Sequence, residues 1–248
     1  MMRLDRFLSE MGAGTRSEIK EACRKKQVRV NGELAKKSDL KVDPDMDQVE
    51  YKGSPVVYAA YEYYMLNKPA GVVTAVVDPH QKTVIDLITG QSRKDLFPVG
   101  RLDKDTEGLL LITNDGPLCQ KLLSPKHHVD KVYYARTSGE MKPECVDKFR
   151  EGLDIGDEKL TQPAELKILS VKPVECTAED AEASGYESEI LLTLTEGRYH
   201  QVKRMCEVVG CTVIYLKRLS MGSLKLDENL AAGEYRKLTE EEVEMLRK

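Results

Sequence analysis

Several features that would assign a protein at once are missing from this sequence. No segment approaches the roughly 18 apolar residues that span a bilayer, and the start, MMRLDRFLSEMG, lacks the apolar core of a signal peptide. The six cysteines form no C-x-x-C pair, so neither a disulfide framework nor a zinc site is indicated. No G-x-G-x-x-G fingerprint, P-loop or cluster of metal ligands occurs. We therefore expect a cytoplasmic protein with no membrane segment, no metal and no cofactor.

The charge of the chain is unevenly distributed. The 248 residues include 38 Lys and Arg and 42 Asp and Glu, and the net charge of −4 alone would argue against a nucleic-acid partner. Residues 1–41, however, hold eleven basic and six acidic residues, which gives +5 there and leaves −9 for the remainder. A basic segment on an acidic body can bind phosphates locally while the whole protein stays soluble.

The basic segment has the pattern of two short helices and a hairpin. Apolar residues at helical spacing between Leu4 and Met11 predict one short helix, which the glycines after it end. Thr15 and Glu18 form a capping box that opens a second helix. Asn31-Gly32, between alternating residues, predicts a hairpin with a type I′ turn. Together these elements make a compact unit of roughly 50 residues.

A basic stripe runs along the second helix, and a solvated helix face is the alternative interpretation of it. The architecture favours RNA binding, because residues 3–51 resemble the small RNA-binding module named after ribosomal protein S-four. The resemblance implies an RNA-binding module at residues 1–53, and Gly53 and Pro55 then mark residues 54–60 as a linker. The cations expected to contact RNA here are Arg3, Arg16, Lys20, Arg24, Lys25 and Arg29.

Residues 61–248 alternate strand-like segments with a few helices. Strands are expected at YEYYMLNK, GLLLIT, KVYYARTS, SEILLTLT and TVIYLKRLSM, and helices after Asp115, around YHQVKRMCEVV and at the C-terminal TEEEVEMLRK. Hairpin-like spacing with three or four helices predicts an α+β fold. The larger domain would then be a mixed, mostly antiparallel β-sheet with flanking helices.

The segment GRLDKDTEGLLLITNDG, residues 100–116, allows three interpretations. Its acids match the opening of a calcium-binding EF-hand loop except at the third ligand, but Asn114 replaces the required bidentate Glu and strands replace the flanking helices. A phosphatase would need D-x-D after a buried parallel strand, and FPVGRL is a poor strand of that kind. In the third interpretation a turn presents Asp103 alone, ionised at neutral pH and ready to act as nucleophile or base.

Four segments favour the third interpretation. GRLDKDTEGLLLITNDG, LNKPAGVVT, SPKHHVDKVYYA and TEGRYHQVKRM resemble, in order and spacing, the pseudouridine synthases of the RsuA group. The resemblance implies a pseudouridine synthase fold at residues 61–248, and as partner 16S rRNA or the assembling small ribosomal subunit, bound by a monomer. SPKHHVDKVY and EGRYHQVKRM are most similar to the enzyme that isomerises uridine 516 of 16S rRNA. A 23S rRNA synthase of the same family, a non-catalytic RNA-binding assembly factor and the phosphatase remain as alternatives.

The resemblance also implies roles for individual residues. Asp103 would be the essential carboxylate, which either adds covalently to the sugar or abstracts a proton from it. Tyr133 would stack on the uracil after it leaves its base stack. Lys203 would pair with Asp103 and orient it, with Arg204 as the nearest competitor for that role. Further cations expected to neutralise RNA phosphates or frame the pocket are Arg101, Lys131, Arg198 and Arg204.

The remaining polar residues receive supporting roles. Asp105 and Glu107 are assigned to the structure of the turn. His127, His128 and His200 are expected to contact RNA or to form structural hydrogen bonds, because the reaction requires no imidazole. The acidic segment CTAEDAEASGYESE, residues 176–189, would repel phosphate, and we expect it to face solvent away from the RNA.

Overall fold

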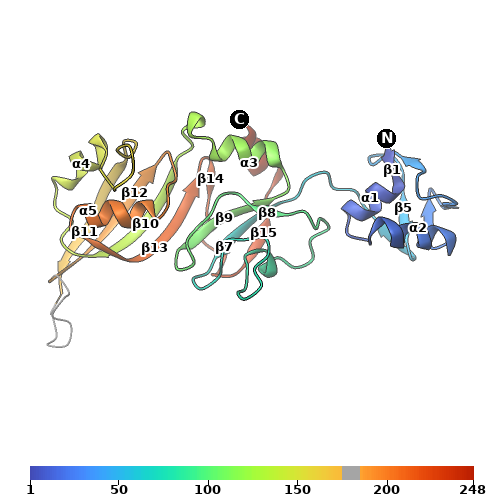
Figure 1. The fold of residues 1–248 in the computed structure, drawn as a ribbon, viewed down its shortest axis with the longest axis horizontal. Helices are drawn as coiled ribbons and strands as arrows, with labels where there is room; N and C mark the ends of the chain where they lie inside the picture. Colours follow the sequence, from blue (N-terminus) through green and yellow to red (C-terminus); the bar gives the residue numbers. More distant parts are fainter. Residues whose placement is uncertain (175–184) are drawn as a thin grey trace. The chain divides into compact units, whose positions relative to one another are not determined.

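The structure, a computed structural model, describes residues 1–174 and 185–248, and it divides into two compact units (Figure 1). The N-terminal unit comprises Met1–Glu62 and Ile88–Phe97. The C-terminal unit comprises Tyr63–Leu87 and Pro98–Lys248. The smaller unit is therefore built from two separate stretches of the chain.

Both predicted helices of the N-terminal unit are present. Helix α1 (Leu4–Glu10) turns its apolar side inward, and Leu4, Phe7 and Leu8 are fully or almost fully buried. Helix α2 (Arg16–Arg24) begins with the predicted capping box, in which Thr15 and Glu18 each accept the other's backbone N–H. The helices pack on the core that the small strands complete, as the apolar periodicity requires.

The strands of the N-terminal unit form two small sheets. Asn31 and Gly32 both have positive φ, 52° and 80°, so the predicted type I′ hairpin is confirmed. Lys52 and Gly53 repeat this geometry, and the segment expected as a linker contains a strand that pairs with the one before it. One sheet has the order β3-β2-β5-β6 and the other pairs β1 with β4. The strands are β1 (Met2–Arg3), β2 (Val28–Val30), β3 (Glu33–Leu34), β4 (Lys41–Val42), β5 (Val49–Tyr51) and β6 (Ser54–Val56).

Residues 88–97 join this unit through Arg93, whose guanidinium is buried. It donates to Glu10 at 3.1 Å and to both carboxylate oxygens of Asp95 at 2.8 and 2.6 Å. The backbone N–H of Arg93 donates to Glu62 at 3.0 Å. A buried guanidinium is tolerated only when its charge and its donors are paired, and these contacts supply that pairing. The N-terminal unit thus extends beyond the predicted boundary at residue 53.

The C-terminal unit is organised around one large sheet. Within the described residues it has nine strands, with the order β11-β12-β10-β13-β9-β7-β15 and with β14 and β8 attached to β13 and β9. Only the β9–β13 pairing is parallel among these, so the predicted mixed, mostly antiparallel sheet is confirmed. The strands are β7 (Tyr63–Lys68), β8 (Phe97–Pro98), β9 (Glu107–Thr113), β10 (Lys131–Ser138), β11 (Glu165–Pro173), β12 (Tyr186–Leu194), β13 (Thr212–Met221), β14 (Leu224–Lys225) and β15 (Tyr235–Lys237).

Helices cover this sheet over two hydrophobic cores. Helices α4 and α5 pack on the β10–β13 half, and α3 and α6 contribute to the core around β7 and β9 (Figure 1). The predicted N-cap at Asp115 and the capping box of Thr239 and Glu242 are both present. Helix α4 and strand β11 were not expected from the sequence. The helical elements are η1 (Ile85–Leu87), α3 (Gly116–Leu123), η2 (Pro125–His127), α4 (Cys145–Glu151), α5 (Gln201–Val208) and α6 (Glu240–Arg247).

None of the helices in residues 1–174 and 185–248 has the length and apolar character needed to cross a bilayer.

Candidate active site

Asp103 lies on a turn that leads directly into β9. Its side chain is 28% exposed, and its backbone carbonyl accepts the N–H of Thr106 at 3.1 Å, which closes the turn. The preceding residue, Leu102, is buried. The segment after β7 holds it on both sides, because the hydroxyl of Thr74 donates to the Leu102 carbonyl at 2.7 Å and accepts its N–H at 3.3 Å. The carboxylate is therefore presented on a braced backbone.

A buried lysine supports the same turn from inside. Lys68, the last residue of β7, is 0% exposed, and its ammonium donates to the carbonyls of Pro69, Lys104 and Thr106 at 3.0, 3.2 and 2.8 Å. Burial lowers the pKa of Lys68 to about 8, although the nearby acids Asp105, Asp103 and Glu107 act in the opposite direction. The Lys68 ammonium thus links Lys104 and Thr106 of the turn to β7. It also places a positive charge near the acidic side chains of the turn.

Gly108 fixes the distance between this turn and β13. Its φ is +99°, and a Cβ there would lie 2.8 Å from the backbone nitrogen of Arg218 and closer still to its carbonyl oxygen. Only glycine allows the two strands to approach so closely in this conformation. The strand predicted at GLLLIT carries this glycine, and β9 pairs in parallel with β13 through Glu107 with Lys217 and Gly108 with Arg218.

Lys203 and His200 approach the turn from helix α5. The ammonium of Lys203 lies 3.5 Å from Asp103 and donates to both oxygens of Asp105 at 2.8 and 2.7 Å. The imidazole Nε2 of His200, at the N-cap of α5, lies 3.6 Å from the other oxygen of Asp103. The structure thus brings the predicted pair Asp103 and Lys203 together, but the closer partner of Lys203 is Asp105, which sequence reasoning had assigned to the turn alone.

The charge of Lys203 and the charges of Asp103 and Asp105 stabilise one another. The hydrogen bond from Lys203 lowers the pKa of Asp105, and burial opposes this only in part. For Lys203 burial acts to lower the pKa, but its hydrogen bond to Asp105 and the charges of both aspartates outweigh it, so the pKa is raised. Lys203 is therefore held as a cation between two carboxylates.

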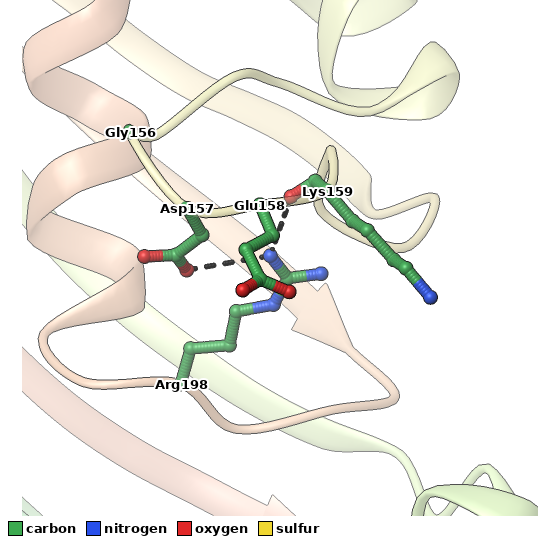
Figure 2. A pocket seen from close by; sticks show the side chains of 5 residues that line it. All are labelled: Gly156, Asp157, Glu158, Lys159 and Arg198. Carbon is green, nitrogen blue, oxygen red and sulfur yellow. Dashed lines mark hydrogen bonds and ion pairs between the residues drawn. The ribbon is translucent and has the colours of Figure 1, made fainter.

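Arg204 and Arg198 bind Asp157 and nearby backbone carbonyls. Arg204 donates to the carbonyls of Ile155 and Tyr199 and pairs with Asp157 at 2.5 Å. Arg198 donates to Asp157 at 3.3 Å and to the carbonyl of Lys159 at 2.7 Å, at the surface pocket that Figure 2 shows. Both guanidiniums hold the loop before β11 against α5, which favours a structural role over the predicted RNA contacts. Lys203, and not Arg204, is the neighbour of Asp103 in the structure, since Arg204 pairs with Asp157.

Tyr133 lies on β10 and is half-buried against the core of α4 and α5. Arg218 stands opposite it on β13, buried, with its Nε donating to the carbonyl of Leu109 at 2.8 Å. Tyr134, on the other face, donates its hydroxyl to Glu189 at 2.8 Å. The stacking role of Tyr133 remains a prediction.

Lys131, expected to contact RNA, is 6% exposed. Its ammonium donates to the carbonyl of Val129 at 2.7 Å. Burial and the charge of Arg218 lower its pKa. This position favours a structural role for Lys131. Arg101, by contrast, is exposed beside the turn.

The predicted cations of the N-terminal unit lie at the surface. Arg16, Lys20 and Arg24 are exposed on α2, as the stripe in the sequence indicated. Several of the group already have partners in the protein. Arg3 pairs with Asp5 at 2.6 Å, Arg24 and Lys25 each lie 3.6 Å from Glu21, and Arg29 donates to the carbonyl of Gly32 at 2.8 Å.

Sequence reasoning missed Lys68, Thr74 and the second role of Asp105. The signal was present, since LNKPAGVVT carries the lysine and the threonine. A lysine at the end of an apolar strand gives no indication of which distant carbonyls it will bind, and two of the three lie 36 and 38 residues away. Most of the acidic segment 176–189 lies outside the described residues.

Comparisons with known proteins agree with this geometry. A family model described as RNA pseudouridylate synthase matches residues 62–208, and one described as S4 domain matches residues 2–49. An uncharacterized RNA pseudouridine synthase of Bacillus subtilis (strain 168) is 46% identical over 246 residues, 99% of this chain and 98% of the relative. The ribosomal small subunit pseudouridine synthase A of Yersinia pestis is 38% identical over 244 residues, 98% of this chain and 97% of the relative. A crystal structure of a pseudouridylate synthase, 34% identical, superposes with a TM-score of 0.65 over 99% of this chain and 100% of that one.

Proposed function

This chain belongs to the RNA pseudouridylate synthase family and carries an N-terminal S4 domain, and from this premise we propose that it isomerises a uridine of 16S rRNA, at position 516. The relatives named for the small ribosomal subunit support 16S rRNA as the substrate, because they match almost the whole chain at 36–38% identity. The proposed partner is this rRNA, free or in the assembling small subunit, in the cytoplasm.

The reaction exchanges one bond to the sugar for another. The bond between nitrogen 1 of uracil and carbon 1′ of ribose breaks, the base turns, and carbon 5 bonds to carbon 1′. Carbon 5 then loses its proton and nitrogen 1 gains one, so nothing is oxidised and no group leaves the RNA. The protein must therefore supply a reactive carboxylate at the sugar and hold the detached base.

The observation that carries this proposal is the setting of Asp103. It lies on a turn fixed by Thr74 and Lys68, between the ammonium of Lys203 at 3.5 Å and the imidazole of His200 at 3.6 Å. Covalent addition to carbon 1′ and removal of a proton from the sugar both require an ionised carboxylate in a fixed position. The braced backbone holds the carboxylate in place, and the Lys203 ammonium lies beside it.

Base flipping and RNA docking complete the proposal. A uridine must leave its stack, at a cost of a few kcal/mol, and the half-buried ring of Tyr133 is the proposed surface that receives the uracil. The exposed cations of α2, Arg16, Lys20 and Arg24, are the proposed phosphate contacts of the S4 domain. Arg101, exposed next to the catalytic turn, is proposed to contact phosphate near the target.

Tritium release tests the reaction directly. 16S rRNA labelled at carbon 5 of uracil, free and in partial small subunits, should release tritium to water in proportion to the pseudouridine formed. Asp103→Asn, which keeps the size of the side chain but removes its charge, should release none above background. Asp147→Asn on α4, an exposed aspartate paired with Arg150, is the matched control and should behave as the wild type. Release by Asp103→Asn at the wild-type rate would contradict the assigned site, and release only on 23S rRNA would contradict the assigned substrate.

A further inference from the structure

Tyr199 is an exposed aromatic ring beside the catalytic carboxylate, and the reaction chemistry above leaves it unused. Tyr199 is 72% exposed, which is unusual for so large a side chain. It stacks on the imidazole of His200, with ring centroids 3.8 Å apart and an angle of 17° between the planes. His200 in turn lies 3.6 Å from Asp103. The stacked pair thus begins at the catalytic site and ends in solvent.

The backbone holds this pair in place before any ligand binds. His200 adopts the left-handed conformation, with φ 48° and ψ 34°, a geometry that costs energy in a non-glycine residue. Arg204 donates to the carbonyl of Tyr199 at 3.1 Å, and the carbonyl of His200 accepts the backbone N–H of Arg204 at 3.0 Å. The side chain of Gln201 accepts the N–H of Arg198 at 2.9 Å on the other side. Hydrogen bonds on both sides therefore hold the backbone that carries the two rings.

We propose that the Tyr199–His200 pair is a stacking subsite for the nucleobase next to the target uridine, a proposal that rests on the proposed function. When a uridine leaves its stack, its neighbour loses a stacking partner and exposes a flat apolar face. An exposed aromatic ring that stacks on His200, which lies 3.6 Å from the carboxylate, can take the place of the lost base. Because every base has such a face, the subsite stabilises the opened RNA without selecting a sequence.

The expected size of the effect follows from base–aromatic stacking. Loss of one stacked base should lower the affinity for RNA by roughly 5- to 150-fold. The single-turnover rate at subsaturating enzyme should fall by the same factor. Tyr199→Ala should show this loss and Tyr199→Phe should not, since the ring is retained. Tyr186→Ala, which removes another exposed tyrosine from β12 of the same unit, is the matched control and should behave as the wild type. Circular dichroism and thermal melting should be the same for all three variants and the wild type, because both tyrosines are at the surface.

An RNA with a missing base separates stacking from other roles of the tyrosine. Three synthetic stem-loops carry the same tritiated target uridine: one is intact, one lacks the base on the 5′ side, and one lacks the base on the 3′ side. The penalty of Tyr199→Ala should be present on the intact RNA and should vanish on one of the two abasic RNAs. An equal penalty on all three RNAs, or no penalty on the intact one, would overturn the subsite while leaving the synthase function in place. No tritium release by the wild type on any RNA would overturn both.

Discussion

The buried ammonium of Lys68 allows a quantitative test of how the active-site turn is built. Its pKa is about 8 against an ordinary value of 10.5, and at about 1.36 kcal/mol per pKa unit this difference is worth about 3 kcal/mol. Below pH 8 the folded and unfolded chains both hold the proton, so this cost of burial is fully present. Between pH 8 and 10.5 the folded chain releases the proton while the unfolded chain retains it, and the stability of the wild type should therefore rise with pH.

Urea unfolding of the wild type and Lys68→Met between pH 7 and pH 10 measures this effect. The stability of the wild type relative to the variant should be constant up to about pH 8 and should then increase by about 2–3 kcal/mol by pH 10. Titration of other groups affects both proteins and cancels in the difference. Lys126→Met, which removes an exposed lysine from η2, should not reproduce the increase. A flat difference between wild type and Lys68→Met over this range would refute the reasoning.

Activity provides a second measurement on the same variant. Lys68→Met removes the donor of three carbonyls of the turn region, and the buried one, that of Thr106, costs about 1–3 kcal/mol when it is left unsatisfied. We expect the turn to relax and Asp103 to move, which should lower kcat about 10- to 100-fold, while RNA affinity changes little because the RNA-facing surface is intact. An unchanged kcat in a folded Lys68→Met variant would show that the turn holds its position without the lysine.

Three further predictions concern other supports of the structure. Gly108→Ala should lower the free energy of unfolding by more than about 3 kcal/mol, because the Cβ would collide with the backbone of β13; a denaturant midpoint equal to that of the wild type would contradict this. Thr74→Val should reduce kcat about 10-fold by removing both hydrogen bonds to the turn, whereas Thr74→Ser should restore the rate in the tritium assay. Deletion of residues 1–53 removes Glu10 and leaves the buried Arg93 with less pairing, so the shortened chain should be less stable and less soluble than the full chain, and a stable monomer in size-exclusion chromatography would contradict this expectation.

Much of the local structure could be predicted from the sequence because neighbouring residues determine it. The two capping boxes, the Asn31-Gly32 turn and the inward-facing residues of α1 depend on side chains within about four positions of one another. The mixed, mostly antiparallel sheet followed from the spacing of its strands. Helix α4 and strand β11 were missed although each has a short apolar pattern: Cys145 and Phe149 lie four residues apart, and Leu166 and Ile168 alternate with polar residues. Such short patterns become ordered elements through tertiary packing, β11 by pairing with β12 and α4 by packing on β11.

In the candidate site, by contrast, contacts between residues far apart in the sequence determine which side chains meet. The motifs in the sequence, through their resemblance to the synthase family, indicated which segments carry the chemistry and implied that Asp103 and Lys203 pair, and the structure brings these two within 3.5 Å. The tertiary structure alone decided that Lys203 binds Asp105 more closely, that Arg204 turns to Asp157, and that residues 88–97 pack in the N-terminal unit. Lys203 and Asp105 are 98 residues apart, and the direction of a side chain across such a separation depends on how helices and strands pack, which no local pattern encodes.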